Sequence, residues 1–413
     1  SFFLLNAGGE ELQELEVTNS VLGCADNPPG TFRGEASVDH TAWMTRPSRM
    51  ACGSCHDDID FEAGEGHPAQ QNDDNCGLCH QPDSGNEYDA SVNGAHQLFY
   101  KSAQLGGFYV DVVSIEDTDP GDSPLVTFKM FDKSGPIMTS EINRLRFSIQ
   151  GPNEDFSYRV EETATNGLVQ DGDNWTYRFA AKLPMDAMGS YTLGVEGRLD
   201  AAIDVGEDEP FEDEDQMETF SVAFAVTGDS VMPRRKIVED YKCENCHSRL
   251  SLHGDNRQNA TDYCQTCHSP DATDAAVRPA DAGEPQSIDF RYMVHKIHRG
   301  AELETGYTVY GYRSSFHDYS EVHYVGELSN CEGCHVDDSY MLPLPATNMA
   351  VTTPRDYWSP MLPETASCLS CHDSSAAASH ADSNTGDFGE SCSVCHGEGS
   401  TYAVEAVHSG LGN

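Results

Sequence analysis

The chain has 413 residues, of which 69 are acidic and 24 are basic, so its formal net charge is −45. This charge excludes a nucleic-acid partner, because binding phosphates requires a basic face; a well-hydrated surface, adaptation to a saline habitat and scattered calcium sites all agree with it. Only 38% of the residues are hydrophobic, which is little for the several cores that this length predicts, so something other than aliphatic side chains must fill part of the interior.

The first 50 residues show no clear periodicity, and we expect an extended, loop-rich segment. Ser1–Leu5 (SFFLL) is too short to span a membrane, and no basic region precedes it. No longer apolar stretch follows, so we expect an exported chain without a transmembrane segment, whose targeting segment has been removed. Val21–Cys24 (VLGC) resembles a lipoprotein box but lacks an apolar region before it. Cys24 is therefore interpreted as a buried free thiol or as half of an intermolecular disulfide.

Fourteen of the fifteen cysteines fall into one repeated pattern, Cys-x-x-Cys-His. Two thiols three positions apart can bond to the two vinyl groups of one porphyrin, and the histidine that follows can bind its iron as proximal ligand. The pattern predicts seven covalently attached haems c, which are attached outside the cytoplasm. The motifs are Cys52/Cys55/His56, Cys76/Cys79/His80, Cys243/Cys246/His247, Cys264/Cys267/His268, Cys331/Cys334/His335, Cys368/Cys371/His372 and Cys392/Cys395/His396.

Two other uses of cysteine do not fit this pattern. Structural zinc requires four protein ligands, usually from paired Cys-x-x-Cys units. A disulfide framework would not place a histidine after every second cysteine. Haem also answers the question of the interior, because seven apolar macrocycles can supply the packing surface that the composition lacks.

Ten further histidines decide what the iron can do. They share the distribution of the cysteines, since neither residue occurs between Leu98 and Tyr241, and this predicts that most of them bind iron. Every haem can then be bis-histidine, and such an iron carries electrons because it has no open position for a substrate. The alternative is a multihaem reductase with one open haem, a class in which an altered attachment motif often marks the open site; no motif here is altered.

An internal repeat indicates which histidines are distal ligands. Met50–His96 and Ala366–His408 share the order motif, histidine, motif, histidine, and both place their first cysteines 24 residues apart. In the centre, two histidines three positions apart project from one face of a helical turn. The predicted distal ligands are His67, His96, His253, His295, His298, His380 and His408. Three histidines are spare: His40, His317, which is open between ligand and surface residue, and His323, which is interpreted as an exposed strand residue.

The stretch between the second and third motifs differs in character. It contains short β-rich runs separated by Gly, Pro, Asp and Asn, which predict an antiparallel β-sandwich or split barrel with Greek-key links. The acidic run Glu207–Glu218 is interpreted as a solvated loop. The expected strands are Phe108–Ile115, Leu125–Phe131, Leu145–Gln150, Phe156–Val160, Trp175–Ala180, Ser190–Glu196 and Thr219–Val226.

The chain is therefore expected to be multidomain, with haem-packed domains of loops and short helices flanking the β-domain. The expected divisions are residues 1–50 (extended N-terminal segment), 51–105 (two haems), 106–228 (β-domain) and 229–413 (five haems).

The C-terminal part resembles the outer-surface decahaem cytochromes of metal-reducing bacteria, the MtrC/OmcA type. The resemblance covers roughly Gly107–Asn413 and rests on KCENCHSRLSLHGDNR, YCQTCHSPDATD, FRYMVHKIHRG, YTVYGYRSSFHDYSEVHY, NCEGCH and SCSVCHGEGSTYAVEAVH. It implies that Phe108–Val226 is similar to the second β-domain of that family and Met232–Asn413 to its second five-haem domain. The chain departs from the family at its front, where two haems stand in place of a β-domain and five haems.

These observations predict extracellular electron transfer at the cell surface rather than an enzyme. The resemblance implies metal oxides, flavins and other cytochromes as the partners that accept electrons. The shortened front adds the hypothesis of a cytochrome filament, a nanowire of identical subunits in which the haem chain continues between neighbours and a spare histidine such as His40 binds a neighbour's iron.

Overall fold

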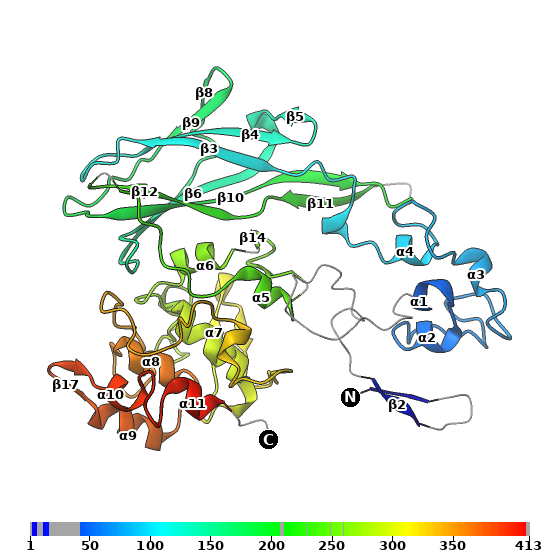
Figure 1. Ribbon diagram of the computed structural model, residues 1–413. Coiled ribbons are helices and arrows are strands. Elements are labelled where there is room, and N and C mark those ends of the chain that lie inside the picture. Colours follow the sequence, from blue (N-terminus) through cyan, green and yellow to red (C-terminus); the bar gives the residue numbers. More distant parts are fainter. Residues whose placement is uncertain are drawn as a thin grey trace.

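The computed structural model describes residues 2–5, 11–15, 42–206, 210–228, 230–247, 249–258 and 260–409. Figure 1 shows a layered β-domain lying against the C-terminal region (residues 230–409), with the first two haem motifs in a separate small lobe (residues 42–105) at one end of the β-domain. Cys24 and His40, to which the sequence assigned hypotheses, lie outside the described residues.

One sheet of the β-domain is organised around a single long strand. The strand order is β11-β10-β6-β7, all antiparallel, and β12 pairs with the first half of β10 while β11 pairs with its second half. The strands are β6 (Ile142–Gly151), β7 (Tyr158–Thr163), β10 (Ser190–Ile203), β11 (Phe211–Gln216) and β12 (Phe220–Ala225).

The second sheet packs over the first. Its antiparallel order is β3-β4-β9-β8, with β5 paired to β4. The strands are β3 (Tyr109–Glu116), β4 (Leu125–Asp132), β5 (Gly135–Pro136), β8 (Val169–Asp171) and β9 (Asn174–Arg178).

Alternation along the strands builds the core between the two sheets. On β4, Val126, Phe128 and Met130 are buried while Lys129 is exposed, which is the period of two expected for a strand with one buried face. Phe147 of β6 meets Phe128 edge to face, with ring centres 5.1 Å apart. The predicted β-sandwich is confirmed, and each of the seven expected strands overlaps an observed one.

The interpretation of the acidic run as a loop is wrong for Phe211–Gln216, which form strand β11. β10 is 14 residues long, and its second half, Arg198–Ile203, finds its partner in this run. Glu212 and Asp213 of β11 are both exposed, while Asp215 is buried and accepts a hydrogen bond from the Gly107 amide (2.6 Å). Pairing with a long neighbour therefore outweighs the low strand propensity of acidic residues.

The other face of the first sheet lies against the C-terminal region. Residues of β10 that alternate with its core side chains, Thr192, Gly194 and Glu196, are directed there and are buried. Gly194 permits this contact, because a Cβ at that position would lie 2.6 Å from the Tyr263 ring.

The C-terminal region consists of short helices and two-residue or three-residue strands. Its buried apolar cluster is small and centres on Tyr292, Tyr307 and Met361. The helices are α5 (Asp240–Glu244), α6 (Thr261–Cys267), α7 (Phe290–Arg299), α8 (Pro363–Leu369), α9 (Ser375–Ser383), α10 (Ser393–His396) and α11 (Val404–His408). The hairpins are β13 (Ser251–Leu252) with β14 (Arg257–Gln258), β15 (Thr308–Tyr310) with β16 (Phe316–Asp318), and β17 (Thr385–Gly386) with β18 (Gly389–Glu390).

The first lobe contains four one-turn helices. It is joined to the β-domain by Phe99, whose ring stacks on Phe211 at 4.2 Å, and to the C-terminal region by Tyr100, whose ring lies 4.3 Å below the Arg249 guanidinium. The helices are α1 (Ala42–Thr45), α2 (Arg49–Gly53), α3 (Cys76–Cys79) and α4 (Val92–Ala95), and a hairpin of β1 (Phe2–Leu5) and β2 (Glu11–Leu15) precedes them.

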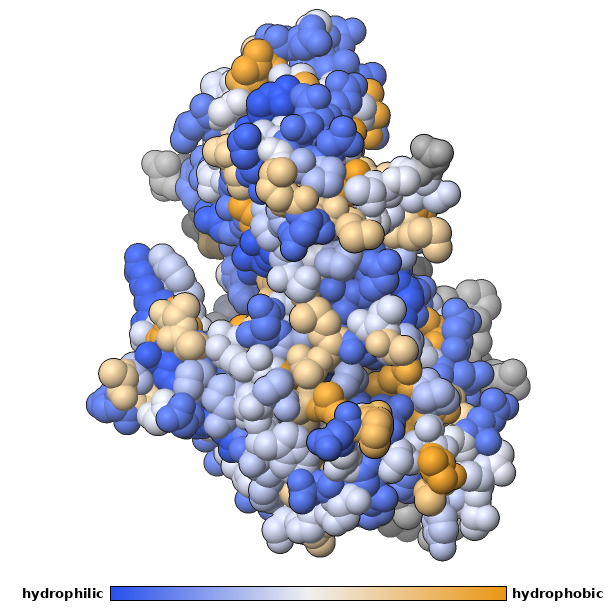
Figure 2. All heavy atoms as spheres, turned by 90° about the vertical axis from the view of Figure 1, so that its left-hand side faces the viewer, coloured by the Kyte–Doolittle hydropathy of each residue, from blue (hydrophilic) through white to orange (hydrophobic). Residues whose placement is uncertain are grey.

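On the face shown in Figure 2, hydrophilic residues predominate and hydrophobic ones are scattered between them. In the described part of the chain, no helix combines the length and the apolar character that crossing a membrane requires.

Candidate haem-binding sites

Every Cys-x-x-Cys-His motif adopts one helical turn. The histidine amide donates to the carbonyl of the first cysteine in all seven motifs, at 2.9–3.0 Å. Because side chains three and four positions apart lie on one side of such a turn, both thiols and the imidazole are directed to the same place. This local geometry fits a porphyrin held by two thioether bonds above its proximal ligand.

The attachment cysteines are enclosed by the protein to different degrees. All fourteen are free of disulfide bonds, and none is fully buried. Nine are partly buried, whereas the other five are exposed: Cys55, Cys79, Cys246, Cys368 and Cys395.

Three of the exposed thiols share one place in their motifs. Cys55, Cys246 and Cys395 are each the second cysteine of a motif, and each lies at or just beyond the end of a helix of four or five residues. Their predicted role in haem attachment rests on the motif turn, which directs both thiols and the imidazole to the same place.

Each motif histidine faces a second histidine at nearly constant separation. The seven pairs have ring centres 6.0–6.1 Å apart: His56 with His96, His80 with His67, His247 with His298, His268 with His253, His335 with His295, His372 with His408, and His396 with His380. The second members are the seven histidines that the sequence predicted as distal ligands.

This separation fits an iron ion between the rings. Two metal–imidazole bonds of about 2 Å, with about 1 Å from each ring centre to its nitrogen, span about 6 Å. Direct ring stacking would bring the centres closer than this, so the spacing is that of two ligands on opposite sides of one metal.

Hydrogen bonds at Nδ1 leave Nε2 as the ligating atom in many of these rings. Nδ1 lies 2.7–3.0 Å from a backbone carbonyl or a serine hydroxyl in His67, His80, His96, His268, His295, His298, His335, His396 and His408. A ring that donates from one nitrogen is fixed in orientation and tautomer, and its other nitrogen is free for a metal.

Two of these partners are serines that sequence reasoning missed. Ser370 already donates to the Ser367 carbonyl (2.6 Å), so it accepts from Nδ1 of His295 (3.0 Å). Ser339 likewise donates to the Ile237 carbonyl and accepts from His335. Nothing in the sequence marks these serines, because the contact with His295 spans 75 residues.

Burial keeps several of the imidazoles neutral, which is the form that binds a metal. Burial, with a smaller contribution from His335, lowers the pKa of His295 to about 3. Burial also lowers the pKa of His253 and of His335 to about 4.

The two copies of the internal repeat share one crossed arrangement. In each copy, the histidine that lies in the sequence between the two motifs faces the histidine of the second motif. The histidine that follows the second motif faces the histidine of the first motif. Thus His67 and His380 occupy equivalent positions, as do His96 and His408. In the centre, α7 directs His295 and His298 to two different motif histidines, His335 and His247.

Attachment sites that are neighbours can be identified from their thiols. Burial raises the pKa of Cys243 to about 12, with Cys334 as the next cause. Cys243 in turn contributes to the raised pKa of Cys264. In the same way, Cys331 contributes to the raised pKa of Cys371, and Cys368 contributes to the raised pKa of Cys392. Each of these pairs of thiols is therefore close enough for one thiol to affect the ionisation of the other.

The described spare histidines lie apart from these pairs. His317, on β16, is exposed and its Nε2 is 2.9 Å from the Ser315 hydroxyl. His323 is exposed in a loop rather than on a strand. Among the described residues, no group of three or more His, Cys, Asp or Glu side chains is arranged to hold a free metal ion, so the calcium hypothesis gains no site there.

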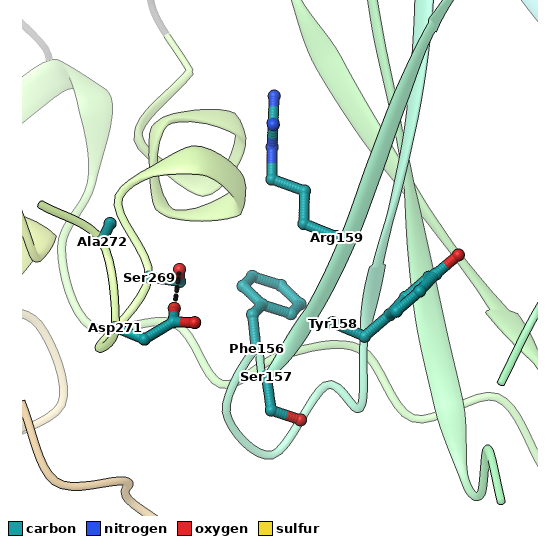
Figure 3. A pocket seen from close by; sticks show the side chains of 7 residues that line it. All are labelled: Phe156, Ser157, Tyr158, Arg159, Ser269, Asp271 and Ala272. Carbon is teal, nitrogen blue, oxygen red and sulfur yellow. Dashed lines mark hydrogen bonds between the residues drawn. The ribbon is translucent and has the colours of Figure 1, made fainter. Parts of the chain in front are cut away.

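A pocket of about 390 Å³ lies between the β-domain and the loop that follows His268. Figure 3 shows Phe156, Tyr158 and Arg159 on the β-domain side and Ser269 and Asp271 opposite them. Burial alone would lower the pKa of Arg159, but Cys267 and Glu161 raise it above its usual value. The pocket therefore adjoins the Cys264/Cys267 attachment site.

Together these features define the class of a multihaem c-type cytochrome. A family model described as "Outer membrane cytochrome MtrC/MtrF-like, domains II/IV" matches residues 235–409. The C-terminal region of this chain is thus similar to a domain of MtrC/MtrF-like outer membrane cytochromes.

Two further comparisons find similarity to MtrC of Shewanella baltica OS185. "Multiheme cytochrome MtrC" of Shewanella baltica (strain OS185) is 28% identical over 151 residues, which are 33% of this chain and 22% of the relative. The crystal structure of MtrC from Shewanella baltica OS185 matches the fold with a TM-score of 0.60 and 17% identity, over 89% of this chain and 63% of that one. The chain thus spans less than two thirds of each relative.

Proposed function

We propose that this chain binds seven haems c, each with two histidine ligands, and transfers electrons outside the cytoplasm. The observation that carries the proposal is the set of seven histidine pairs at 6.0–6.1 Å. A haem c held in this way supplies reversible one-electron exchange. The residues of the chain attach it, hold both axial imidazoles in one tautomer and exclude water from the more buried sites.

The alternative function, a reductase with one open haem, predicts a motif histidine without a facing ring. All seven motif histidines are described, and each has such a partner, so the pairs favour electron transfer. The partners that follow are other cytochromes, metal oxides and flavins at the cell surface, in line with the outer-membrane location that the matching family model names.

The filament hypothesis remains part of the proposal in a narrower form. If each pair binds its own iron, no axial position is left for the His40 of a neighbouring subunit. A haem chain that continues between subunits would then depend on packing of the two end regions. Electron micrographs of the native protein that contain only separate particles would contradict the filament.

Haem counting and spectroscopy test the ligand assignment. The pyridine haemochrome assay and the intact mass should both give seven haems per chain, and the oxidised protein should have a purely low-spin optical and EPR spectrum. His408→Ala should convert one haem of seven to the high-spin form, whereas the control His317→Ala should leave the spectrum unchanged. A high-spin haem in the unmodified protein would favour the reductase.

A further inference from the structure

One of the seven sites depends on a hairpin that cannot be stable alone. His253 lies in the turn between β13 and β14, which have two residues each, and its φ is +59°. An isolated two-stranded hairpin is marginal in water even at greater length, and a positive φ at a non-glycine residue costs further free energy. Contacts from elsewhere must therefore hold the His253 ring opposite His268.

The β-domain supplies these contacts. Arg257 of β14 donates from Nε to Glu196 Oε2 (2.8 Å), and the Thr219 hydroxyl donates to the Gln258 carbonyl (2.8 Å). Arg198 donates to the side chain of Asn256, in the turn itself (3.1 Å). The hairpin is thus fastened along one side to β10 and to the segment that leads into β12.

The same glutamate also holds the proximal side of the site. The Tyr263 hydroxyl donates to Glu196 Oε2 (2.9 Å), and Tyr263 directly precedes Cys264 in α6. The absence of a side chain at Gly194 lets the Tyr263 ring lie against β10. One carboxylate therefore connects the helix that carries both attachment cysteines with the hairpin that carries the distal histidine.

Glu196 is buried without solvent contact and is balanced by two arginines. Its side chain is 0% exposed, and Arg144 donates to Oε1 (2.6 Å) while Arg257 donates to Oε2. Burial would raise the pKa of this carboxyl, but Arg257 and Arg144 hold it below its usual value. Removing the negative charge would leave Arg144 without its carboxylate partner and Arg257 with only Glu161, 3.7 Å away, and the positions of both guanidinium groups would shift.

We propose that Glu196 is a positioning residue for the haem site of Cys264, Cys267, His268 and His253, so that the β-domain completes a haem site of the C-terminal region. This inference rests on the proposed bis-histidine ligation. It goes beyond that function because it assigns the positioning of one haem's distal ligand to a β-strand residue that does not contact the metal. It also predicts a charge effect, since loss of the carboxylate leaves excess positive charge beside the site and favours the reduced form.

Glu196→Gln in the full haem-loaded chain tests the proposal, with His253→Ala as the reference. His253→Ala should convert one haem of seven to the high-spin form. Glu196→Gln should give a part of that same high-spin signal, or an upward shift in the midpoint potential of one haem in a spectroelectrochemical titration. The double variant should show no more high-spin haem than His253→Ala alone, because both changes act on one site.

The matched control is Glu162→Gln. Glu162 is a carboxylate of β7 that binds the Tyr177 hydroxyl (2.8 Å) and the Ala180 and Ala181 amides, with no recorded contact to the hairpin or α6. It should lower the stability of the β-domain and leave all seven potentials unchanged. Thr219→Val, which removes the two hydrogen bonds between the Thr219 hydroxyl and the Gln258 backbone, should shift the same haem as Glu196→Gln by a smaller amount. It also covers the case in which Glu196→Gln fails to fold.

The outcomes separate the inference from the function on which it rests. If the unmodified protein has seven low-spin haems and both Glu196→Gln and Thr219→Val match Glu162→Gln, the positioning role is wrong and the proposed function stands. An additive high-spin signal in the double variant would also overturn the role. If the unmodified protein already contains a high-spin haem, the proposed function fails and the inference fails with it.

Discussion

The β-domain and the C-terminal region lie against each other, but their interiors are filled differently. Among the described residues, 22 buried hydrophobic side chains form one cluster between the sheets of the β-domain. The C-terminal region is longer, yet its described cluster contains ten. Its haem motifs instead contribute histidine pairs and partly buried thiols that face common spaces. The β-domain thus has a conventional core, whereas we expect the proposed haems to supply much of the packing surface of the C-terminal region.

The largest difference between the two regions is expected when the chain is produced without haem. A chain produced without haem attachment should keep a folded β-domain, because its core is complete, while the C-terminal region and the first lobe unfold. Limited proteolysis with mass spectrometry should leave a protected fragment close to residues 106–228. Protection of residues 230–409 in the haem-free chain would show that their side chains pack without haem.

A change in the β-domain core should act on that domain alone. Phe147 is 0% exposed between the sheets, so Phe147→Ala should lower the free energy of unfolding by about 3–5 kcal/mol. The haem spectrum should change only at higher temperature, when the domain unfolds. Val169→Ala is the control, because Val169 is 63% exposed and should cost less than about 0.5 kcal/mol. Calorimetry and thermal melts followed at the haem bands measure both.

The contact between the two regions should be sensitive to one buried ion pair. Asp155, whose side chain is 1% exposed, binds Arg234 (2.8 Å) and accepts from the Met349 amide (2.8 Å). Asp155→Ala leaves Arg234 unpaired and should cost about 3 kcal/mol, and it should separate the unfolding of the two regions into two calorimetric transitions.

Asp117→Asn serves as the comparison for this change. The Asp117–Arg178 pair is about half exposed on both sides (52% and 50%), so its loss should cost less than about 0.5 kcal/mol. If the two substitutions lowered the free energy of unfolding equally, burial of the Asp155–Arg234 pair would not explain its contribution to stability.

The smallest expected effect concerns pH, and it has opposite signs in the two regions. Burial, and then Asp373, raise the pKa of Asp356 to about 6, and Asp356 accepts from the Tyr292 hydroxyl. The folded state then binds more protons than the unfolded state, so this contribution to stability is lost as the pH rises from about 4 to about 6. Asp356→Asn should raise the free energy of unfolding at pH 7 by on the order of 2 kcal/mol and add nothing at pH 4.

Glu196 should behave in the opposite way. The pKa of its carboxyl is lowered in the folded state, so its contribution is present above the ordinary glutamate pKa and is lost as the pH falls. Denaturant unfolding of Asp356→Asn and of the unmodified protein between pH 4 and pH 7 measures the difference. Parallel pH curves for the two proteins would contradict the assignment to Asp356.

The sequence predicted the β-sandwich well because alternation is a local property. Leu125–Phe131 was expected as a strand from its pattern, and β4 covers Leu125–Asp132. It missed β11, because Phe211–Gln216 is acidic and forms a strand only where the second half of β10 needs a partner. It also missed β5 and β8, which have two and three residues.

The sequence by itself determined the haem motifs, because five consecutive residues supply both thiols and the proximal imidazole. The internal repeat also indicated which histidines in the first and last pairs of motifs are equivalent. Only the tertiary structure decided that His295 faces His335 while His298 faces His247, since neighbours on one helix meet motifs that lie on different sides of it. The link from Glu196 to Tyr263 and Arg257 likewise spans more than 60 residues. Such contacts arise only when the sheet and the haem region pack together, and no local pattern encodes them.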